Sequence, residues 1–214
     1  MSLVGVSARR ILVALAVAAL NAAPAPAQDE GVKQVEALVK KAGVTVQTIA
    51  ETKVQLVKTM DVYNALLAED AKDRKGQYKK LQKEMEATEK RRADIELRAQ
   101  EMSGEAEALF KSWGDAAAAI ESADLRKRSE ERLQKTRASY AEVGSVGDKA
   151  TELYGPVMKT LRDHVTYLGH DLNAEAVATL KPDAAKLNEK AQELVKRIDD
   201  TISVTNQNIG TLQP

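Results

Sequence analysis

Residues 78–120 read YKKLQKEMEATEKRRADIELRAQEMSGEAEALFKSWGDAAAAI, a long uninterrupted periodic segment of the chain. Its apolar and small residues recur at steps of three and four, the spacing of one face of an α-helix. They are Tyr78, Leu81, Met85, Thr88, Ile95, Ala99, Met102, Ala106, Leu109, Trp113, Ala117 and Ile120. At about 1.5 Å per residue, such a helix would be roughly 60 Å long. A periodic pattern of this length is typical of coiled coils and predicts a long helix with one narrow apolar seam.

Similar seams lie on either side of this stretch. They occupy residues 32–67, with an interruption at Lys53, and then residues 125–168 and 187–209. Each helix must bury its apolar seam on its neighbours, and helices joined by short connections pack antiparallel. We therefore predict an all-α fold, an antiparallel bundle of about four long coiled-coil-like helices, in a single elongated domain over residues 28–214.

The connections are predicted at residues 69–76, 121–124 and 169–173. The first has almost no apolar member, and the other two contain residues that cap helix N-termini. Ser122 or Asp124 can cap the third helix, and Asn173 can cap the fourth.

Glycine, proline and β-branched residues mark weak points within these helices. Gly43 and the β-branched residues that follow it predict a kink, with a strand over residues 44–49 as the less favoured alternative. In the third helix, Gly144, Gly147 and Gly155 indicate either close approach of a neighbouring helix or a break near Gly144. Pro182 either starts a first turn or kinks the fourth helix.

Composition excludes several kinds of chemistry. The chain has 32 basic and 32 acidic residues, and this balance argues against a nucleic-acid partner, which usually requires a basic domain. It has no cysteine, which rules out disulfides, a thiol nucleophile, thiolate metal sites and a lipidated N-terminal cysteine. Aromatic residues make up only 3% of the chain, which fits long helices with narrow seams better than a compact globular core.

The N-terminus has the pattern of a secretory signal. Arg9 and Arg10 precede an apolar run over residues 11–20, and the small residues ending at Ala27 form a cleavage site. Ten apolar residues make about 15 Å of helix, whereas a membrane span needs about 30 Å. We therefore predict a signal peptide over residues 1–27 and an exported, periplasmic protein that is soluble after cleavage.

Three segments resemble one bacterial family. They are DLRKRSEERL at residues 124–133, LRDHVTYLGHDLNA at residues 161–174, and EALF with the following tryptophan at residues 107–113. The chain resembles, over roughly residues 30–210, a family of exported helical proteins described only as domain of unknown function 2959 (DUF2959). This resemblance implies a shared fold, and it brings no established activity, substrate or catalytic residue.

Two histidines are the strongest candidates for a metal or acid–base site. His164 and His170 each lie next to an aspartate, Asp163 and Asp171. Six residues on a helix separate the histidines by about 240°, and the His–Asp pairs that share a face lie about 10.5 Å apart along the axis. Neither pair can ligate one zinc ion without a break in the helix. We therefore expect a structural role, with His170 at a helix C-terminus where a cation is favoured.

A basic cluster begins the third helix. It comprises Arg126, Lys127, Arg128, Arg132, Lys135 and Arg137. Cations at a helix N-terminus oppose the helix dipole, so local helix energetics do not explain them. In one interpretation they are neutralised by Asp29, Glu30, Asp199 and Asp200 from the ends of the first and fourth helices. In the other, the cluster is a cationic tip that docks on anionic lipid headgroups or on an acidic partner.

A second group of cations is interleaved with acidic residues in the second helix. Its members are Lys72, Arg74, Lys75, Lys79, Lys80, Lys90, Arg91 and Arg92. Such a pattern is typical of a solvated coiled-coil flank stabilised by i,i+4 ion pairs. Phe110 and Trp113 fall on or beside the second seam, where they are expected in the core.

No nucleotide-binding loop or serine-nucleophile motif is present, so we expect neither an enzyme nor a cofactor. The leading hypothesis is a non-enzymatic exported envelope protein, a structural or protein-interaction bundle with an unknown protein partner. The alternative is a periplasmic holdase-like protein or a binder of anionic membrane surfaces through residues 126–137, and a metal protein or enzyme using His164 and His170 ranks third. The candidate partner-binding residues are Arg126, Lys127, Arg128, Arg132 and His170. Seams of this kind also fit a homo-oligomer.

Overall fold

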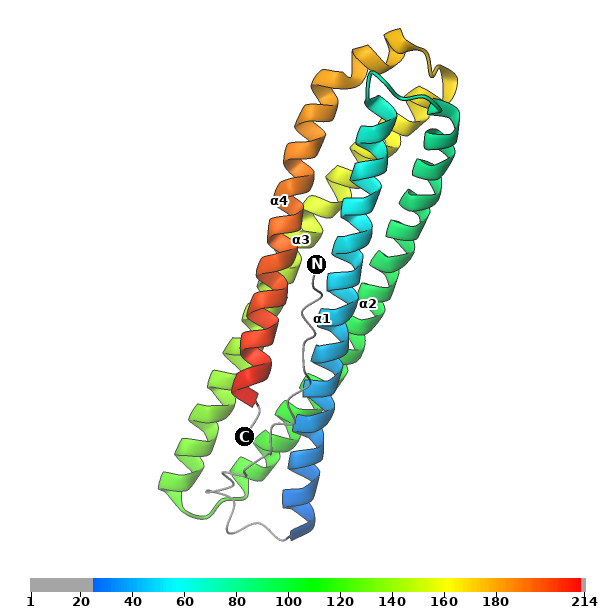
Figure 1. Cartoon of the computed structure of the whole chain (residues 1–214). Coiled ribbons are helices and arrows are strands. Elements are labelled where there is room, and N and C mark those ends of the chain that lie inside the picture. Colours follow the sequence, from blue (N-terminus) through cyan, green and yellow to red (C-terminus); the bar gives the residue numbers. More distant parts are fainter. Residues whose placement is uncertain (1–24, 213–214) are drawn as a thin grey trace, which may run out of the picture.

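The computed structural model describes the backbone of residues 25–212 and the side chains of residues 31–212. It consists of four helices: α1 (Ala25–Leu67), α2 (Arg74–Ala118), α3 (Ala123–His170) and α4 (Ala174–Leu212). Successive helices run antiparallel, and both α1 and α3 pack against α2 and α4 (Figure 1). The predicted all-α antiparallel bundle of four long helices is confirmed. The predicted signal peptide lies largely outside the described residues.

The helix ends follow local sequence. Asp73, Ser122 and Asn173 precede α2, α3 and α4, and each side chain accepts the backbone N–H of the residue three positions on. Of the two caps predicted for α3, Ser122 is confirmed and Asp124 is wrong, and the predicted cap Asn173 of α4 is confirmed. The last connection is shorter than predicted, because α3 continues to His170. No helix within residues 25–212 combines the length and the apolar character that a membrane span requires.

The seam of α1 is continuous, so the predicted interruption at Lys53 is wrong. The buried residues of α1 that lie at seam spacing are Leu38, Ala42, Thr45, Thr52, Leu56, Thr59, Tyr63 and Leu66. Three of them are threonines at seven-residue spacing, and each hydroxyl donates to the carbonyl four residues earlier. Because their own helix satisfies the hydroxyls, these polar side chains can be buried at seam positions. The strand alternative for residues 44–49 is wrong, since α1 is helical throughout this stretch.

Two hydrophobic clusters form the core. The larger one lies toward the α1–α2 and α3–α4 connections and is built around residues such as Tyr63, Leu161 and Leu187. The smaller one joins α1, α2 and α3 nearer the α2–α3 connection and contains Leu38, Ala42, Met102, Ala106, Leu109 and Val143. The core is therefore a long, thin column along the bundle axis.

Helix α3 passes through its glycines without a break. At Gly144, Gly147 and Gly155, an added Cβ would meet no atom of a neighbouring helix within 4 Å, so neither the predicted break nor close helix approach accounts for them. For Gly155 the reason is local, because Pro156 follows it inside the helix. A proline clashes with the Cβ of the preceding residue in helical conformation, and glycine has none.

Close approach of another helix does explain a different glycine, Gly169. A Cβ there would lie 2.6 Å from the hydroxyl oxygen of Tyr78 in α2. Pro182 lies within α4, about two turns after its start, so it does not begin a helix. The part of α4 that precedes Pro182 leans across the end of the bundle, as the kink alternative predicts (Figure 1).

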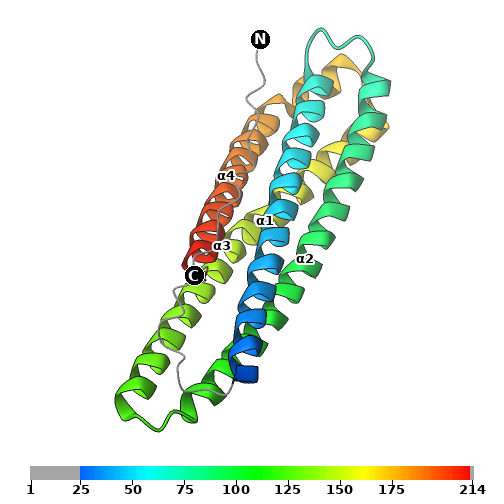
Figure 2. The same cartoon turned by 60° about the horizontal axis from the view of Figure 1, so that its bottom comes forward.

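Helices α2 and α3 extend beyond the end of α4. Leu212, at the end of α4, lies beside Thr136 and Tyr140 of α3, so the first turns of α3 have no α4 neighbour (Figures 1 and 2). Leu125, predicted to lie in the seam, is 49% exposed for this reason. We call residues 110–137 the hairpin end.

Candidate interaction surfaces

His164 lies inside the bundle and is bonded to a tyrosine. Its side chain is buried, and its Nδ1 atom is 2.6 Å from the hydroxyl oxygen of Tyr63 in α1. Burial lowers the pKa of His164, although the negative charges of Asp183 and Asp163 act in the opposite direction. The imidazole is therefore neutral near pH 7 and shares a hydrogen bond with the Tyr63 hydroxyl through its Nδ1.

His170, in contrast to the buried His164, is exposed. It lies in the last turn of α3, as predicted. Asp163 binds Lys159 of its own helix, and Asp171 accepts hydrogen bonds from Asn173. The structure thus does not bring the two histidines and their aspartates together. Within the part of the chain that the structure describes, no group of three or more His, Asp or Glu side chains could hold a metal ion.

The hairpin end combines arginines with half-buried aromatic rings. The Arg132 guanidinium lies 5.9 Å from the centre of the Trp113 ring, and that of Arg137 lies 5.4 Å from the centre of the Phe110 ring. The Trp113 Nε1–H donates to the hydroxyl of Ser129 across the hairpin at 3.0 Å. These contacts hold both arginines against the molecule while leaving them exposed to solvent. Phe110 and Trp113, predicted as core residues, are only partly buried.

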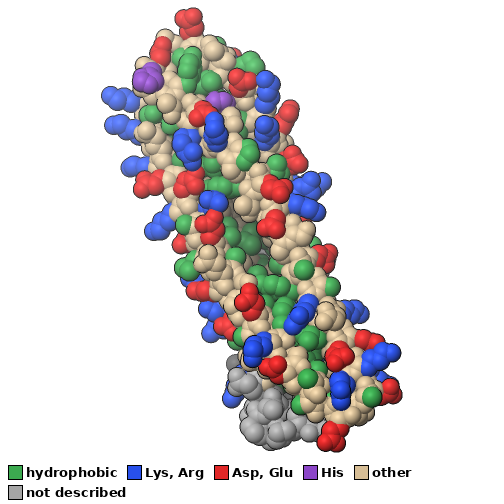
Figure 3. Space-filling model, turned by 180° about the vertical axis from the view of Figure 1, so that it is seen from behind, with side chains coloured by type: hydrophobic (Ala, Val, Ile, Leu, Met, Phe, Trp, Pro, Cys, Tyr) green, Lys and Arg blue, Asp and Glu red, His purple; other side chains and the backbone are tan. Residues whose placement is uncertain are grey.

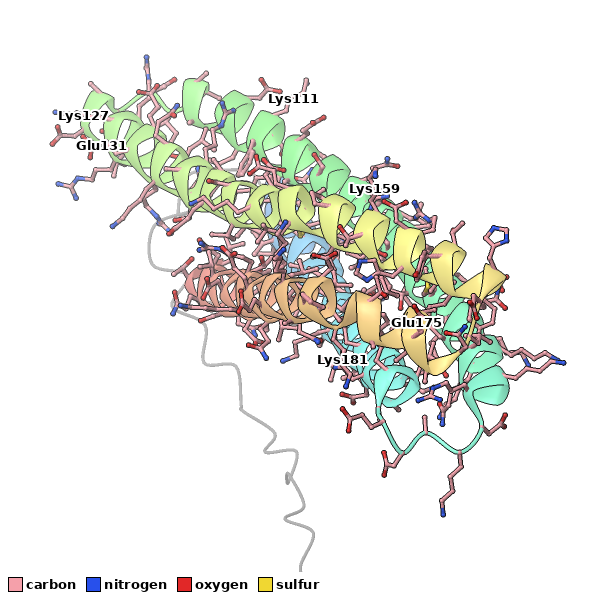
Figure 4. All side chains as sticks on the ribbon, turned by 90° about the horizontal axis from the view of Figure 1, so that it is seen from above. Lys111, Lys127, Glu131, Lys159, Glu175 and Lys181 are labelled. Carbon is pink, nitrogen blue, oxygen red and sulfur yellow. The ribbon has the colours of Figure 1, made fainter. Side chains whose placement is uncertain are left out.

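The remaining members of the basic cluster differ in their contacts. Arg126 donates from Nε to the carbonyl of Ile120 and so closes the turn between α2 and α3. Lys127, Arg128 and Lys135 are exposed and form no ion pair with any residue whose side chain is described. Figure 4 shows Lys127 projecting from the far end of the hairpin, with Glu131 behind it on α3.

The predicted neutralisation of this cluster by α4 is wrong. Asp199 binds Lys53 of α1 at 2.6 Å, and Asp200 lies 3.8 Å from Arg197 of its own helix. Both aspartates lie about 20 Å before the end of α4, and α4 itself stops short of the hairpin end. The side chains of residues 29–30, the other proposed partners, lie outside the described part of the chain.

The second basic group departs from the predicted pattern of i,i+4 pairs. Arg92 pairs with Glu96 in this way, but Arg91 binds Glu51 of α1 instead. The lysines that precede them are exposed. Lys72 lies just before α2, and we call Lys75, Lys79, Lys80 and Lys83 the lysine face of α2. These lysines were not predicted as a separate surface, because they were grouped with later residues of which Arg91 and Arg92 are ion-paired. The available signal was that residues 72–83 contain six cations and a single carboxylate.

Together, these features define an elongated four-helix bundle with a thin core and exposed basic surfaces near both ends. The chain belongs to the family described as "Protein of unknown function (DUF2959)", whose model matches residues 25–212. This membership confirms the resemblance carried by residues 161–174 and its neighbours. No curated protein and no solved structure matches the chain.

Proposed function

We propose that this protein is a non-enzymatic, exported envelope protein that binds another protein through its hairpin end. Export is supported by the charged, apolar and small-residue pattern of residues 1–27. Binding is supported by the surface chemistry of the hairpin end, where α2 and α3 extend past the end of α4 (Figures 1 and 2) and most side chains of residues 121–137 are exposed.

The observation that carries this proposal is the pairing of arginines with aromatic rings at an exposed end. Tryptophan, tyrosine and arginine are enriched among residues that dominate protein–protein binding energy. Arg132 stacked on Trp113, and Arg137 on Phe110, lose less freedom on binding than unrestrained side chains would. A guanidinium binds a carboxylate through two parallel hydrogen bonds. The chemistry therefore suits a protein partner with surface carboxylates.

The position of the histidines also favours binding over catalysis. His164 is buried and engaged with Tyr63, while His170 is exposed at the end of α3, at the opposite end of that helix from the hairpin. General acid–base catalysis requires a group within hydrogen-bonding reach of a substrate. A buried imidazole already bonded to a tyrosine hydroxyl is poorly placed for that role.

Photo-cross-linking in intact cells tests the interaction. A photoreactive amino acid replaces Arg128 at the hairpin end, and a matched control replaces Lys190, an exposed residue of α4. We expect one discrete adduct from position 128, none from position 190, and loss of the adduct when Arg132→Glu is added. Absence of an adduct at 128, or the same adducts from both positions, would rule out the hairpin end as the binding site.

Export is tested separately by fractionating cells that express the full chain and determining the N-terminus of the product. We expect a periplasmic protein that begins at Gln28. A product that retains Met1 and stays in the cytoplasm would contradict export without bearing on the hairpin surface.

A further inference from the structure

The lysine face of α2 is strongly unbalanced in charge. Residues 72–83 read KDRKGQYKKLQK, and their one acidic residue, Asp73, caps the helix by accepting the N–H of Gly76. The whole chain, in contrast, carries equal numbers of basic and acidic residues. The positive charge is therefore concentrated in the first turns of one helix. In Figure 3, Lys and Arg side chains follow one another along one edge of the upper half of the molecule.

These lysines point away from the core. At 100° per residue, Lys75, Lys79 and Lys83 fall within an arc of about 80°, on the side of α2 away from the buried Leu81 and Met85. All three are exposed, and they span about 12 Å along the helix. They form a row of ammonium groups parallel to the bundle axis.

No ion pair with the rest of the described bundle neutralises these three lysines. Glu84 binds Lys58 and Glu89 binds Arg162, and the exposed Glu86, on the same face just beyond Lys83, is paired with none of the lysines. The first turn of α2 has no acidic residue, so the cations also oppose the helix dipole. Lysines four residues apart repel one another. These residues therefore work against local helix stability.

We propose that the lysine face docks the bundle side-on onto the phosphate headgroups of an anionic lipid bilayer. Flexible lysines act as point charges that follow a diffuse field of phosphates, whereas stacked arginines suit a fixed partner. Each basic residue near an anionic membrane surface adds to the attraction without needing a shaped pocket. A straight row on the outer side of one helix matches a flat, negatively charged surface. The proposal uses other residues than the hairpin end and does not depend on it.

Vesicle sedimentation of the full chain tests this docking. Vesicles containing phosphatidylglycerol are compared with neutral phosphatidylcholine vesicles, which measure any attachment through the apolar N-terminal run. We expect additional binding to the anionic vesicles in low salt and its loss in high salt, because ions screen exposed charges. Equal binding to both vesicles, or anionic binding that resists salt, would overturn the proposal.

Two charge-matched variants locate the site. Lys75→Gln/Lys79→Gln/Lys83→Gln removes three charges from the lysine face, and Lys127→Gln/Arg128→Gln/Lys135→Gln removes three from the hairpin end. We expect the first to weaken anionic vesicle binding about ten-fold or more and the second to change it little. Circular dichroism should show unchanged helix content in both.

The other outcomes are equally decisive. Unchanged binding in the lysine-face variant, or a loss confined to the hairpin variant, would refute the assignment. Binding to polyglutamate that needs the lysine face, without binding to anionic vesicles, would refute lipid and indicate an acidic protein. Photo-cross-linking from position 128 tests protein binding by the hairpin end and does not depend on the vesicle experiment. Failure of either proposal therefore leaves the other testable.

Discussion

At the scale of single residues, Tyr63 and His164 form a buried polar contact between α1 and α3. Both side chains are buried, and their rings stack with centroids 5.9 Å apart. A buried imidazole without a partner would cost the free energy of its lost hydration. The Tyr63 hydroxyl supplies that partner, so the pair links α1 to α3 across the bundle.

This pair predicts how stability depends on pH. The pKa of His164 lies below its ordinary value of 6.5, chiefly because of burial. At a pH between the pKa of His164 in the folded protein and 6.5, the unfolded chain binds a proton that the folded chain does not. The free energy of unfolding therefore falls as pH drops through this range, and it keeps its full value above pH 6.5. Urea denaturation between about pH 5 and 7.5 should show this loss at low pH.

Two histidine variants provide the comparison. His164→Gln keeps an acceptor for Tyr63 but cannot titrate, so it should flatten the dependence, whereas His170→Gln, at an exposed position, should preserve it. Greater stability at pH 5 than at pH 7.5 in the unmodified protein would contradict the assignment. The ion-paired Glu101, whose pKa Lys41 lowers most, affects stability only nearer pH 4.

At the scale of helices, buried threonines of α1 face α2, since the hydroxyls of Thr45 and Thr59 lie within hydrogen-bonding distance of α2 carbonyls. Thr52 is 3% exposed, and its hydroxyl bonds only to its own helix, at the carbonyl of Thr48. Thr52→Val keeps nearly the same shape and should change the free energy of unfolding by less than about 1 kcal/mol. Thr52→Leu adds volume in a tight space and should cost about 1–3 kcal/mol.

Thr166→Leu is the matched control, since Thr166 also bonds to the carbonyl four residues earlier but is exposed. Its effect should stay within about 0.5 kcal/mol. Chemical denaturation measures all three variants. If Thr52→Leu lowers the free energy of unfolding no more than Thr166→Leu does, α1 and α2 do not pack tightly around Thr52.

Helix α3 also contains an internal proline, Pro156, whose replacement should stabilise the helix. Pro156 is exposed, lacks the N–H that would bond to the carbonyl of Glu152, and should make α3 less stable than an alanine would. After allowing for the freer unfolded chain, Pro156→Ala should raise the free energy of unfolding by about 2 kcal/mol.

Gly155 tests the explanation for this defect. Gly155→Ala should destabilise the protein while Pro156 is present, because of the clash with the proline ring. In the Pro156→Ala background the same change should stabilise it by about 1 kcal/mol. Additive effects of the two substitutions, measured by thermal or urea unfolding, would contradict this local explanation.

At the scale of the whole molecule, the helices define a rod. The 45 residues of α2 span about 67 Å, so an isolated bundle should have a radius of gyration of about 20 Å. A compact domain of the same size would have about 16 Å. Small-angle X-ray scattering distinguishes the two, and a value near 16 Å would mean that the helices fold back. A markedly larger mass and radius would indicate the homo-oligomer that the seams allow.

Much of the fold was predictable because its causes are local. Helix periodicity follows from bonds between residues four apart, and the seam of residues 78–120 reports that period directly. Ser122 and Asn173 bond to backbone three residues away, so they could be recognised as caps without knowledge of the neighbours. The interruption predicted at Lys53 failed because only apolar residues were counted and the buried Thr52 was not.

The four helices, their antiparallel order and the cap Asn173 followed from local sequence patterns, whereas Asp73, which caps α2, was not recognised. Only the tertiary structure decided that His164 meets Tyr63, that Asp199 meets Lys53, and that α4 stops short of the hairpin end. The physical reason is range. Helix formation depends on neighbours in the chain, whereas burial and ion pairing depend on the axial register between helices, which many weak contacts along the whole core fix together.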